Sequence, residues 1–409
     1  MTWTARVTAL AIALCAVVAG AQTGPAIKVG GMCDRTGATK VIGVEMCPGV
    51  ADYFAMVNRK GGVAGHRLEY TEVDHGYAVA RAVEAYDSLK REGVVTFFTY
   101  GVPTLQGISS RAMEDRIPPF NSGTGRGDAI DGTAWPYIFP GTSSYWSQAG
   151  VAMKYLKDNG ARKGTKVAYL YYDNPAGRDG IPMIESVARL EGYSLRKYAV
   201  QPPGLDMELQ VGEISREFRA DWVITSLFGS PVPVSIKEFR KAGFPLNRVL
   251  SFVYGAGEAD IEEAGWDAAQ GYLGLHYAAL GRDLPVIREI VRMYREDGRE
   301  IPRYVGSAYY NRGVLTAATI VEGIRVAIQN QGMPLTGDKV RRGYEAIRSF
   351  DAQGLGPPLN ITPTDHEGGG YVRVYQVKGG GWAPVTDWMR GYREQVMELV
   401  KEANAKVGR

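Results

Sequence analysis

Short apolar or aromatic runs alternate with longer amphipathic segments along most of the chain. Continuous apolar runs are typical of strands that helices cover on both faces, and apolar positions repeated at helical spacing indicate the covering helices. In the first part of the chain, the predicted strands are 27–32, 67–74, 94–100 and 119–122, with helices over 45–59, 78–91 and 104–115. This alternation predicts a parallel sheet between two layers of helices.

The same alternation then starts again. A predicted helix over 145–158 leads into strands 166–172, 195–200, 222–228 and 249–254, with helices over 183–190, 207–218 and 234–241. The chain is therefore predicted to be α/β, with two Rossmann-like lobes that each contain a parallel sheet.

The pattern changes after Gly271. Amphipathic helices are predicted over 284–295, 308–329 and 338–347, followed by a strand over 371–377 and a charged helix over 391–406. The three amphipathic helices are expected to pack back onto the first lobe, so the chain crosses between the lobes more than once. The predicted parts are 26–146 plus 277–348 for lobe 1, 147–276 plus 349–384 for lobe 2, and 385–409 for the C-terminal helix.

The N-terminus has the pattern of a secretory signal. Arg6 is the only charged residue before Lys28, and an apolar run over 7–19 leads to the small residues Ala19-Gly20-Ala21. Signal peptidase cleaves after such a small-x-small pattern, so we expect cleavage after Ala21. The apolar run is too short to span a bilayer comfortably, and the secreted protein is expected to be soluble.

Length and charge narrow the class of protein. A chain of 409 residues is long enough for two domains. The formal net charge of +3 and the absence of a basic block argue against a nucleic-acid partner.

Cys33 and Cys47 form either a disulfide, worth about 3 kcal/mol for a loop of about 15 residues, or a pair of buried free thiols. Neither a metal site nor a cofactor is expected, because the cysteines lack a CxxC spacing and the four histidines are scattered.

Motifs of covalent catalysis are missing from the sequence. There is no G-x-S-x-G, H-E-x-x-H or Walker loop. The segment Gly123-Thr124-Gly125-Arg126-Gly127 is glycine-rich, but it lacks the glycine spacing and the following helix of a phosphate loop. We expect it to be a flexible surface loop and the protein not to be an enzyme. A pair of catalytic carboxylates in a cleft would need no local motif, so a secreted enzyme stays a hypothesis, ranked third after a transport receptor and a ligand sensor.

Several motifs together resemble one family. The run 58–65, NRKGGVAG, precedes a predicted strand that ends in Asp74, as in the N-x-x-GG-x-x-G … D signature of type I periplasmic binding proteins. Ile117-Pro118-Pro119 and the opening of the second lobe at 166–169 are also similar to this branched-chain amino acid (Leu/Ile/Val) receptor group of ABC transporters. The resemblance implies two lobes joined by three hinge crossovers, a ligand cleft between them, a periplasmic location and a transporter permease as partner.

Ligands of open parallel sheets bind beyond the carboxyl ends of the strands. In lobe 1 this rule selects Tyr100, Gly101, Thr104, Asn121, Ser122 and Thr124, with Tyr145 and Trp146 near the first crossover. Thr104 is predicted to start a helix, where its hydroxyl either binds a ligand carboxylate or is an ordinary N-cap. Ser122 and Thr124 offer further hydroxyl donors to the same carboxylate.

The rule selects aromatic and acidic residues in lobe 2. They are Tyr172, Asp173, Phe228, Tyr254 and Glu258. The rings either enclose an apolar ligand or pack in the core. The resemblance implies that a second-lobe acid, Asp173 or Glu258, holds a ligand ammonium, whereas the alternative for each is a helix-start or solvated acid. Tyr100 and Pro103 stand where amino-acid receptors have small hydroxyl residues, so an aromatic acid or an amide fits as well as an aliphatic amino acid.

The leading hypothesis is a monomeric receptor that closes over a small hydrophobic carboxylate and delivers it to an ABC importer. A soluble sensor with the same fold, acting on a signalling partner, is the second hypothesis. No motif in the chain distinguishes transport from sensing.

Overall fold

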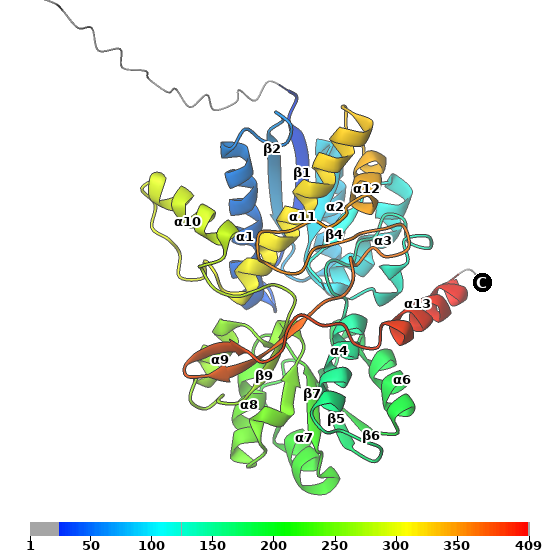
Figure 1. Ribbon diagram of the computed structural model, residues 1–409, viewed down its shortest axis with the longest axis vertical. Coiled ribbons are helices and arrows are strands. Elements are labelled where there is room, and N and C mark those ends of the chain that lie inside the picture. The colour runs from blue at the N-terminus through cyan, green and yellow to red at the C-terminus, as the bar shows by residue number, and fades with distance from the viewer. Residues whose placement is uncertain (1–23, 124, 408–409) are drawn as a thin grey trace, which may run out of the picture.

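Two sheets in separate lobes organise the molecule (Figure 1). The computed structural model describes residues 24–123 and 125–407. The sheet of lobe 1 has four parallel strands in the order β2-β1-β3-β4. These strands are β1 (Ile27–Cys33), β2 (Leu68–Asp74), β3 (Thr96–Thr99) and β4 (Pro119–Asn121). The helices of this lobe are α1 (Lys40–Arg59), α2 (Val79–Glu92), α3 (Val102–Asp115), α10 (Pro285–Glu296), α11 (Ala308–Gln331) and α12 (Gly337–Glu345).

The sheet of lobe 2 has seven strands in the order β11-β10-β9-β8-β7-β5-β6. Five are parallel: β5 (Lys166–Tyr172), β6 (Ser194–Val200), β7 (Trp222–Ser226), β8 (Val249–Ser251) and β9 (Leu273–His276). Two are antiparallel: β10 (Arg373–Lys378) and β11 (Gly381–Pro384). The helices are α4 (Tyr145–Asp158), α5 (Pro175–Arg178), α6 (Ile181–Glu191), α7 (Glu208–Gly212), α8 (Pro231–Lys241) and α9 (Glu258–Ala264).

The central strands are apolar along their whole length because helices cover both of their faces. Every residue of β3 and of β7 is buried, as expected for parallel sheets. Two of the helices end at a glycine in left-handed backbone. Gly93 ends α2 at φ 83° and Gly192 ends α6 at φ 68°, the conformation that glycine adopts without a steric cost.

The chain passes between the lobes three times, between β4 and α4, between β9 and α10, and between α12 and β10 (Figure 1). After β11 the chain forms α13 (Arg393–Val407), which packs beside α4 and α6. The α/β class with two parallel-sheet lobes is therefore confirmed. The boundaries of the lobes as drawn from the sequence stay predictions.

Most predicted elements appear with ends shifted by a few residues, but some interpretations were wrong. The predicted strand 249–254 ends at Ser251 and continues as a 3₁₀ turn, and the predicted helix 207–218 is split into α7 and a π-helical segment, Glu213–Phe218. β9, β11 and α9 were not predicted, because they are too short to show a period.

The glycine-rich segment is not a surface loop. Gly123, Gly125 and Gly127 are all buried, and the Arg126 guanidinium lies 3.9 Å from the centre of the Trp135 ring. Side chains distant in the sequence cover its glycines, Tyr277 at Gly123, Val102 at Gly125 and Trp146 at Gly127, which sequence composition alone could not show. Thr124 and the proposed signal sequence lie outside the described residues.

Candidate functional site

A small cavity lies where the carboxyl ends of strands from both sheets meet. Its volume is about 10 Å³, about the space of one water molecule. Residues that follow β1, β2 and β3 contribute one wall, and residues that follow β7 and β8 or begin α4 contribute the other. The lining consists of Thr39, Ile42, Tyr77, Tyr100, Gly101, Val102, Tyr145, Phe228 and Tyr254.

Aromatic rings from both lobes contact one another around the cavity. The Tyr100 ring of lobe 1 meets the Tyr254 ring of lobe 2 edge-on, with 6.0 Å between ring centres. Tyr77 lies 6.3 Å from Tyr100, and Phe228 is packed at 5.1 Å against Tyr172. Burial raises the pKa of the Tyr100 and Tyr254 phenols above their ordinary value. These hydroxyls are therefore neutral groups that can donate or accept hydrogen bonds.

Ser122 and Tyr254 join the two lobes directly. The Tyr254 hydroxyl donates to the Ser122 carbonyl oxygen at 2.6 Å and lies 2.9 Å from the Ser122 hydroxyl. The Tyr277 hydroxyl also donates to this carbonyl. Ser122 thus holds the first crossover against residues of lobe 2 and the second crossover. The Ser122 hydroxyl was predicted to bind a ligand carboxylate, but in this structure it is already hydrogen-bonded to Tyr254.

Thr104 has a different role from the N-cap considered above. α3 begins at Val102 with Gly101 at the N-cap position, φ 97°, so Thr104 is the third residue of the helix. Its hydroxyl donates to the carbonyl oxygens of Tyr100, at 2.6 Å, and Gly101, at 2.9 Å. The N-cap interpretation was wrong because the helix starts two residues earlier, at Val102. Gly101 and Val102 bring the first turn of α3 to the cavity.

Asn121 and Trp146 lie near the junction but do not line the cavity. The Asn121 amide donates to the Thr99 hydroxyl at 3.1 Å, within the sheet of lobe 1. The Trp146 indole N–H donates to the Asp179 carbonyl oxygen at 2.8 Å. Tyr172 is half-buried and does not line the cavity, but its ring packs against that of Phe228, which does.

The two candidate acids of lobe 2 lie apart from each other and from this cavity. Asp173 accepts hydrogen bonds from Gln201 and Arg178, at 2.7 Å each, and these bonds lower the pKa of its carboxyl. Glu258 accepts from the backbone N–H of Ala308 at 2.8 Å and lines a second cavity of about 460 Å³. Burial raises the pKa of the Glu258 carboxyl.

Thr39, Tyr77 and Arg312 were missed in the sequence. Thr39 and Tyr77 follow β1 and β2, so the strand-end rule would have found them had it been applied to every strand. Arg312 carried no such signal, because it lies on α11, far along the chain. It is fully buried, donates to the Val253 carbonyl oxygen at 2.6 Å, and lies 5.2–5.4 Å from the centres of three tyrosine rings, Tyr254, Tyr277 and Tyr309.

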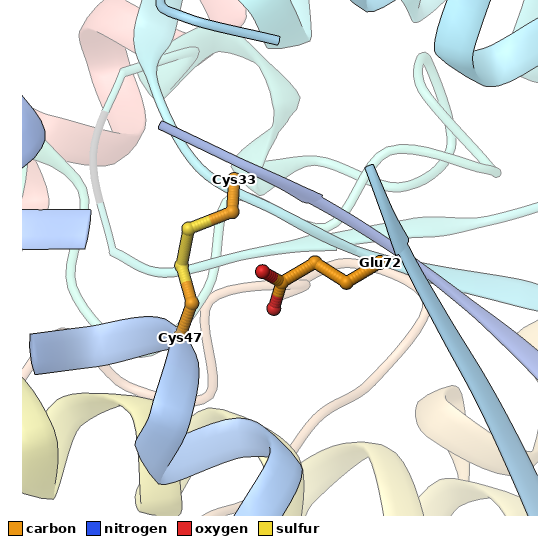
Figure 2. Close-up of side chains that lie close together, drawn as sticks. All are labelled: Cys33, Cys47 and Glu72. Atoms are coloured by element: carbon orange, nitrogen blue, oxygen red, sulfur yellow. A yellow bond between two sulfur atoms is a disulfide. The ribbon is translucent and has the colours of Figure 1, made fainter. Parts of the chain in front are cut away.

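Figure 2 shows a group of possible metal ligands, Cys33, Cys47 and Glu72. The two cysteines are joined in a disulfide that ties β1 to α1. Without a thiolate, the sulfur atoms are not metal ligands in this form. The Glu72 carboxylate instead pairs with the Arg35 guanidinium at 2.5 Å. The grouping is therefore structural.

Comparisons with known proteins agree with this architecture. The family model of periplasmic binding proteins matches residues 26–381. A structure described as an ABC transporter permease from the Pseudomonas fluorescens group is 30% identical with a TM-score of 0.86, covering 93% of this chain and 96% of its own. No curated protein matches the chain.

Two further solved structures share the fold. A branched-chain amino acid ABC transporter protein from Thermus thermophilus with bound valine is 24% identical, with a TM-score of 0.81, and the match covers 92% and 98% of the two chains. A fatty acid ABC transporter substrate-binding protein from Thermomonospora curvata is 20% identical, with a TM-score of 0.78, over 92% and 95%.

The family model and these structures match nearly the whole chain from residue 26 on. In the part of the chain that the structure describes, no helix combines the length and apolar character needed to cross a membrane. The two lobes, the three crossings and the cavity between facing strand ends are the features that such a match predicts. The chain belongs to the periplasmic binding protein family.

Proposed function

We propose that this protein is the extracytoplasmic receptor of an ABC importer and binds a small hydrophobic carboxylate between its lobes. One observation carries the proposal: an aromatic cavity lies at the junction of two α/β lobes, bounded by strand ends from both sheets. Such a junction is where open parallel sheets bind small molecules. The family membership agrees with binding rather than catalysis.

The lining suits a ligand with an apolar body and one polar end. The rings of Tyr100, Tyr145 and Phe228 offer apolar contact, and aromatic faces bury large apolar area. The hydroxyl of Tyr77 and the start of α3 offer polar contact for a carboxylate, whereas the Thr39 hydroxyl already donates to Asp34 at 2.6 Å. Valine and fatty acids, bound or transported by the similar proteins from Thermus and Thermomonospora, share this combination of groups. Aliphatic and aromatic acids and the corresponding amides are therefore the ligand classes to test.

Ligand binding requires the lobes to separate. A cavity of about 10 Å³ is too small for any amino acid. The lobes also approach closely beside it, because a Cβ atom added to Gly229 of lobe 2 would lie 3.4 Å from the Ala38 carbonyl oxygen of lobe 1. Hinge bending at the three crossings would open the cleft, and closure would enclose the ligand.

The proposed setting follows from the family and the N-terminal pattern. The chain would be secreted, cleaved after Ala21 and monomeric, and the closed form would dock on a membrane permease. A sensor of the same fold remains the second candidate, and binding to purified permease would separate the two functions.

A thermal-shift screen of the purified protein tests ligand binding. The panel would contain aliphatic amino acids, aromatic amino acids, benzoate-type acids and the matching amides. A ligand at one hundred times its Kd should add about 2.7 kcal/mol of stability. A carboxylate that stabilises the protein while its amide does not would support the proposed class. Absence of any shift from every acid and amide would contradict it.

Replacing a ring of the cleft tests the place of binding. Phe228→Ala is expected to weaken the affinity for the ligand found in the screen at least tenfold, measured by calorimetry, because the ring lines the cavity. Phe244→Ala is the control, since this phenylalanine packs at the edge of the lobe 2 core away from the cavity. Equal affinities of both variants and the wild type would place the ligand elsewhere.

A further inference from the structure

A second and larger cavity lies between the lobes. Its volume is about 460 Å³, and its walls come from α1 in lobe 1, from α9 in lobe 2 and from the segment that precedes α11. Three carboxylates face it, one from lobe 1 and two from lobe 2. They belong to Glu45, Glu258 and Glu262.

Two of these carboxylates bind the same helix end. Glu45 of lobe 1 accepts a hydrogen bond from the hydroxyl of Ser307, the N-cap of α11, at 2.7 Å. Glu258 of lobe 2 accepts a hydrogen bond at 2.8 Å from the backbone N–H of Ala308, the residue after Ser307. This helix end therefore connects side chains from opposite lobes. Its partial positive charge favours the ionised carboxylates, whereas burial and the neighbouring acids favour the neutral ones.

The surrounding cations neutralise this pair only in part, since the Arg312 charge favours ionised Glu258. Arg303 contacts Glu262 at 2.5 Å, but its side chain is 84% exposed, and such pairs contribute little. Arg282 donates to the carbonyl oxygens of Val305, Pro302 and Arg303. The other groups facing the pair are Asp260 and Glu262 of α9, Tyr304 of the segment before α11, and Arg312 of α11.

Burial favours the neutral form of these acids. It raises the pKa of Glu45 to about 7, with Glu258, Asp260 and Glu262 adding to the rise. Burial also raises the pKa of Glu258, although the bond from Ala308 opposes it. When both carboxylates ionise, two negative charges from opposite lobes face one cavity and repel each other.

We infer that Glu45 and Glu258 form a proton-sensitive contact between the lobes, which holds the cleft closed in mildly acidic surroundings and releases it in alkaline ones. This would regulate the ligand site of the proposed function, but the contact itself needs no ligand. Opening exposes both carboxylates to water and returns them to their ordinary acidity. Closing therefore takes up protons between about pH 4.5 and 7, and the ratio of closed to open protein falls up to about tenfold per pH unit for each proton released.

Small-angle X-ray scattering of the ligand-free protein from pH 5.5 to 8.5 tests the inference. The wild-type radius of gyration is expected to increase with pH. A Glu45→Gln/Glu258→Gln variant keeps both hydrogen-bond acceptors but cannot ionise, so it is expected to stay compact throughout. Glu84→Gln is the control, since this exposed acid on α2 is far from the junction, and it should behave as the wild type does.

Two outcomes would overturn the inference: a wild-type radius that does not change with pH, or an equal increase in the double variant. Circular dichroism at pH 5.5 shows whether the variants fold. If the double variant does not, Glu45→Gln alone should reduce the pH dependence, and an unreduced dependence would count against the contact. Because no ligand is present, a failed ligand screen would not affect this measurement.

Discussion

Tyrosine hydroxyls form hydrogen bonds that connect the two lobes. The Tyr254 hydroxyl reaches Ser122 across the junction, and the Tyr309 hydroxyl donates to the Tyr254 carbonyl oxygen at 3.0 Å. Each ring also buries apolar area, so one side chain supplies both packing and a hydrogen bond. Loss of a hydroxyl would remove a donor from its buried partner, and an incompletely satisfied buried acceptor costs free energy.

Tyr254→Phe is therefore expected to lower the free energy of unfolding by about 1–2 kcal/mol, because the Ser122 carbonyl loses one of its two donors. Urea denaturation measures this. Tyr172→Phe is the matched control, since its half-buried hydroxyl lies outside the contact and should change stability by less than about 0.5 kcal/mol. Equal losses in both variants would show that the loss does not come from the hydrogen bond across the lobe contact.

At the scale of elements, α13 is held to the third crossing by buried charge. Arg393, its first residue, pairs with Asp365 at 2.7 Å and with Glu367 at 2.5 Å. The Glu367 side chain is fully buried and also accepts from the hydroxyl of Ser147 at 2.8 Å and from the backbone N–H of Ser144, the N-cap of α4. One carboxylate thus connects α13, the crossing and α4.

Arg393→Met is expected to cost about 3–5 kcal/mol of stability, because it leaves the buried Glu367 carboxylate without its cation. Arg390→Met, an exposed change three residues earlier, should have little effect. The two variants are compared by urea unfolding at pH 7. A small loss for Arg393→Met would mean that the hydrogen bonds from Ser144 and Ser147 suffice to hold the charge.

The disulfide joins β1 to α1, two elements that border the cleft. Its loop spans 14 positions, so replacing both cysteines by serine is expected to lower the free energy of unfolding by about 3 kcal/mol in the loop-entropy model. Treating the wild type with reductant should produce the same decrease. If the two treatments differ, the serine hydroxyls in the buried site, rather than the lost cross-link, account for the difference.

At the scale of the whole molecule, buried acids make stability depend on pH. Burial raises the pKa of Glu45, Asp179 and Asp260 to about 7 each. A carboxyl whose pKa is higher in the folded state binds its proton more tightly there. Its contribution is complete below the unfolded pKa of about 4 and is lost as the pH rises through 7.

The melting temperature is accordingly expected to be higher at pH 5 than at pH 8. Each of the three carboxyls contributes at most about 1.4 kcal/mol per pH unit over this interval. Asp260→Asn should flatten the dependence, since asparagine keeps an acceptor for the Tyr309 hydroxyl without a titrating proton. Calorimetry of both proteins at the two pH values is the measurement. A melting temperature that rises from pH 5 to pH 8 would contradict the prediction.

Local sequence patterns were sufficient to predict the class of fold. The alternation of apolar runs with amphipathic segments predicted most strands and helices of both lobes, because strand and helix periods are properties of neighbouring residues. The strand-end rule selected Tyr100, Gly101, Phe228 and Tyr254, and the position near the predicted first crossover selected Tyr145. All five line the small cavity. Short elements such as β9 and β11 were not predicted, because four residues show no clear period, and because the fold decides their pairing with β10 and that of β9 with β8.

The partners of each side chain were decided only by the tertiary structure. Thr104, Ser122 and Asp173 looked free to bind a ligand, but the fold supplies each with a hydrogen-bond partner from the protein. Glu258 and Glu45 are 213 residues apart in the sequence, yet both bind the N-terminus of α11. Periodicity reports which face of an element is buried, whereas the contact between two lobes depends on how the whole chain folds back on itself, and no local pattern records that.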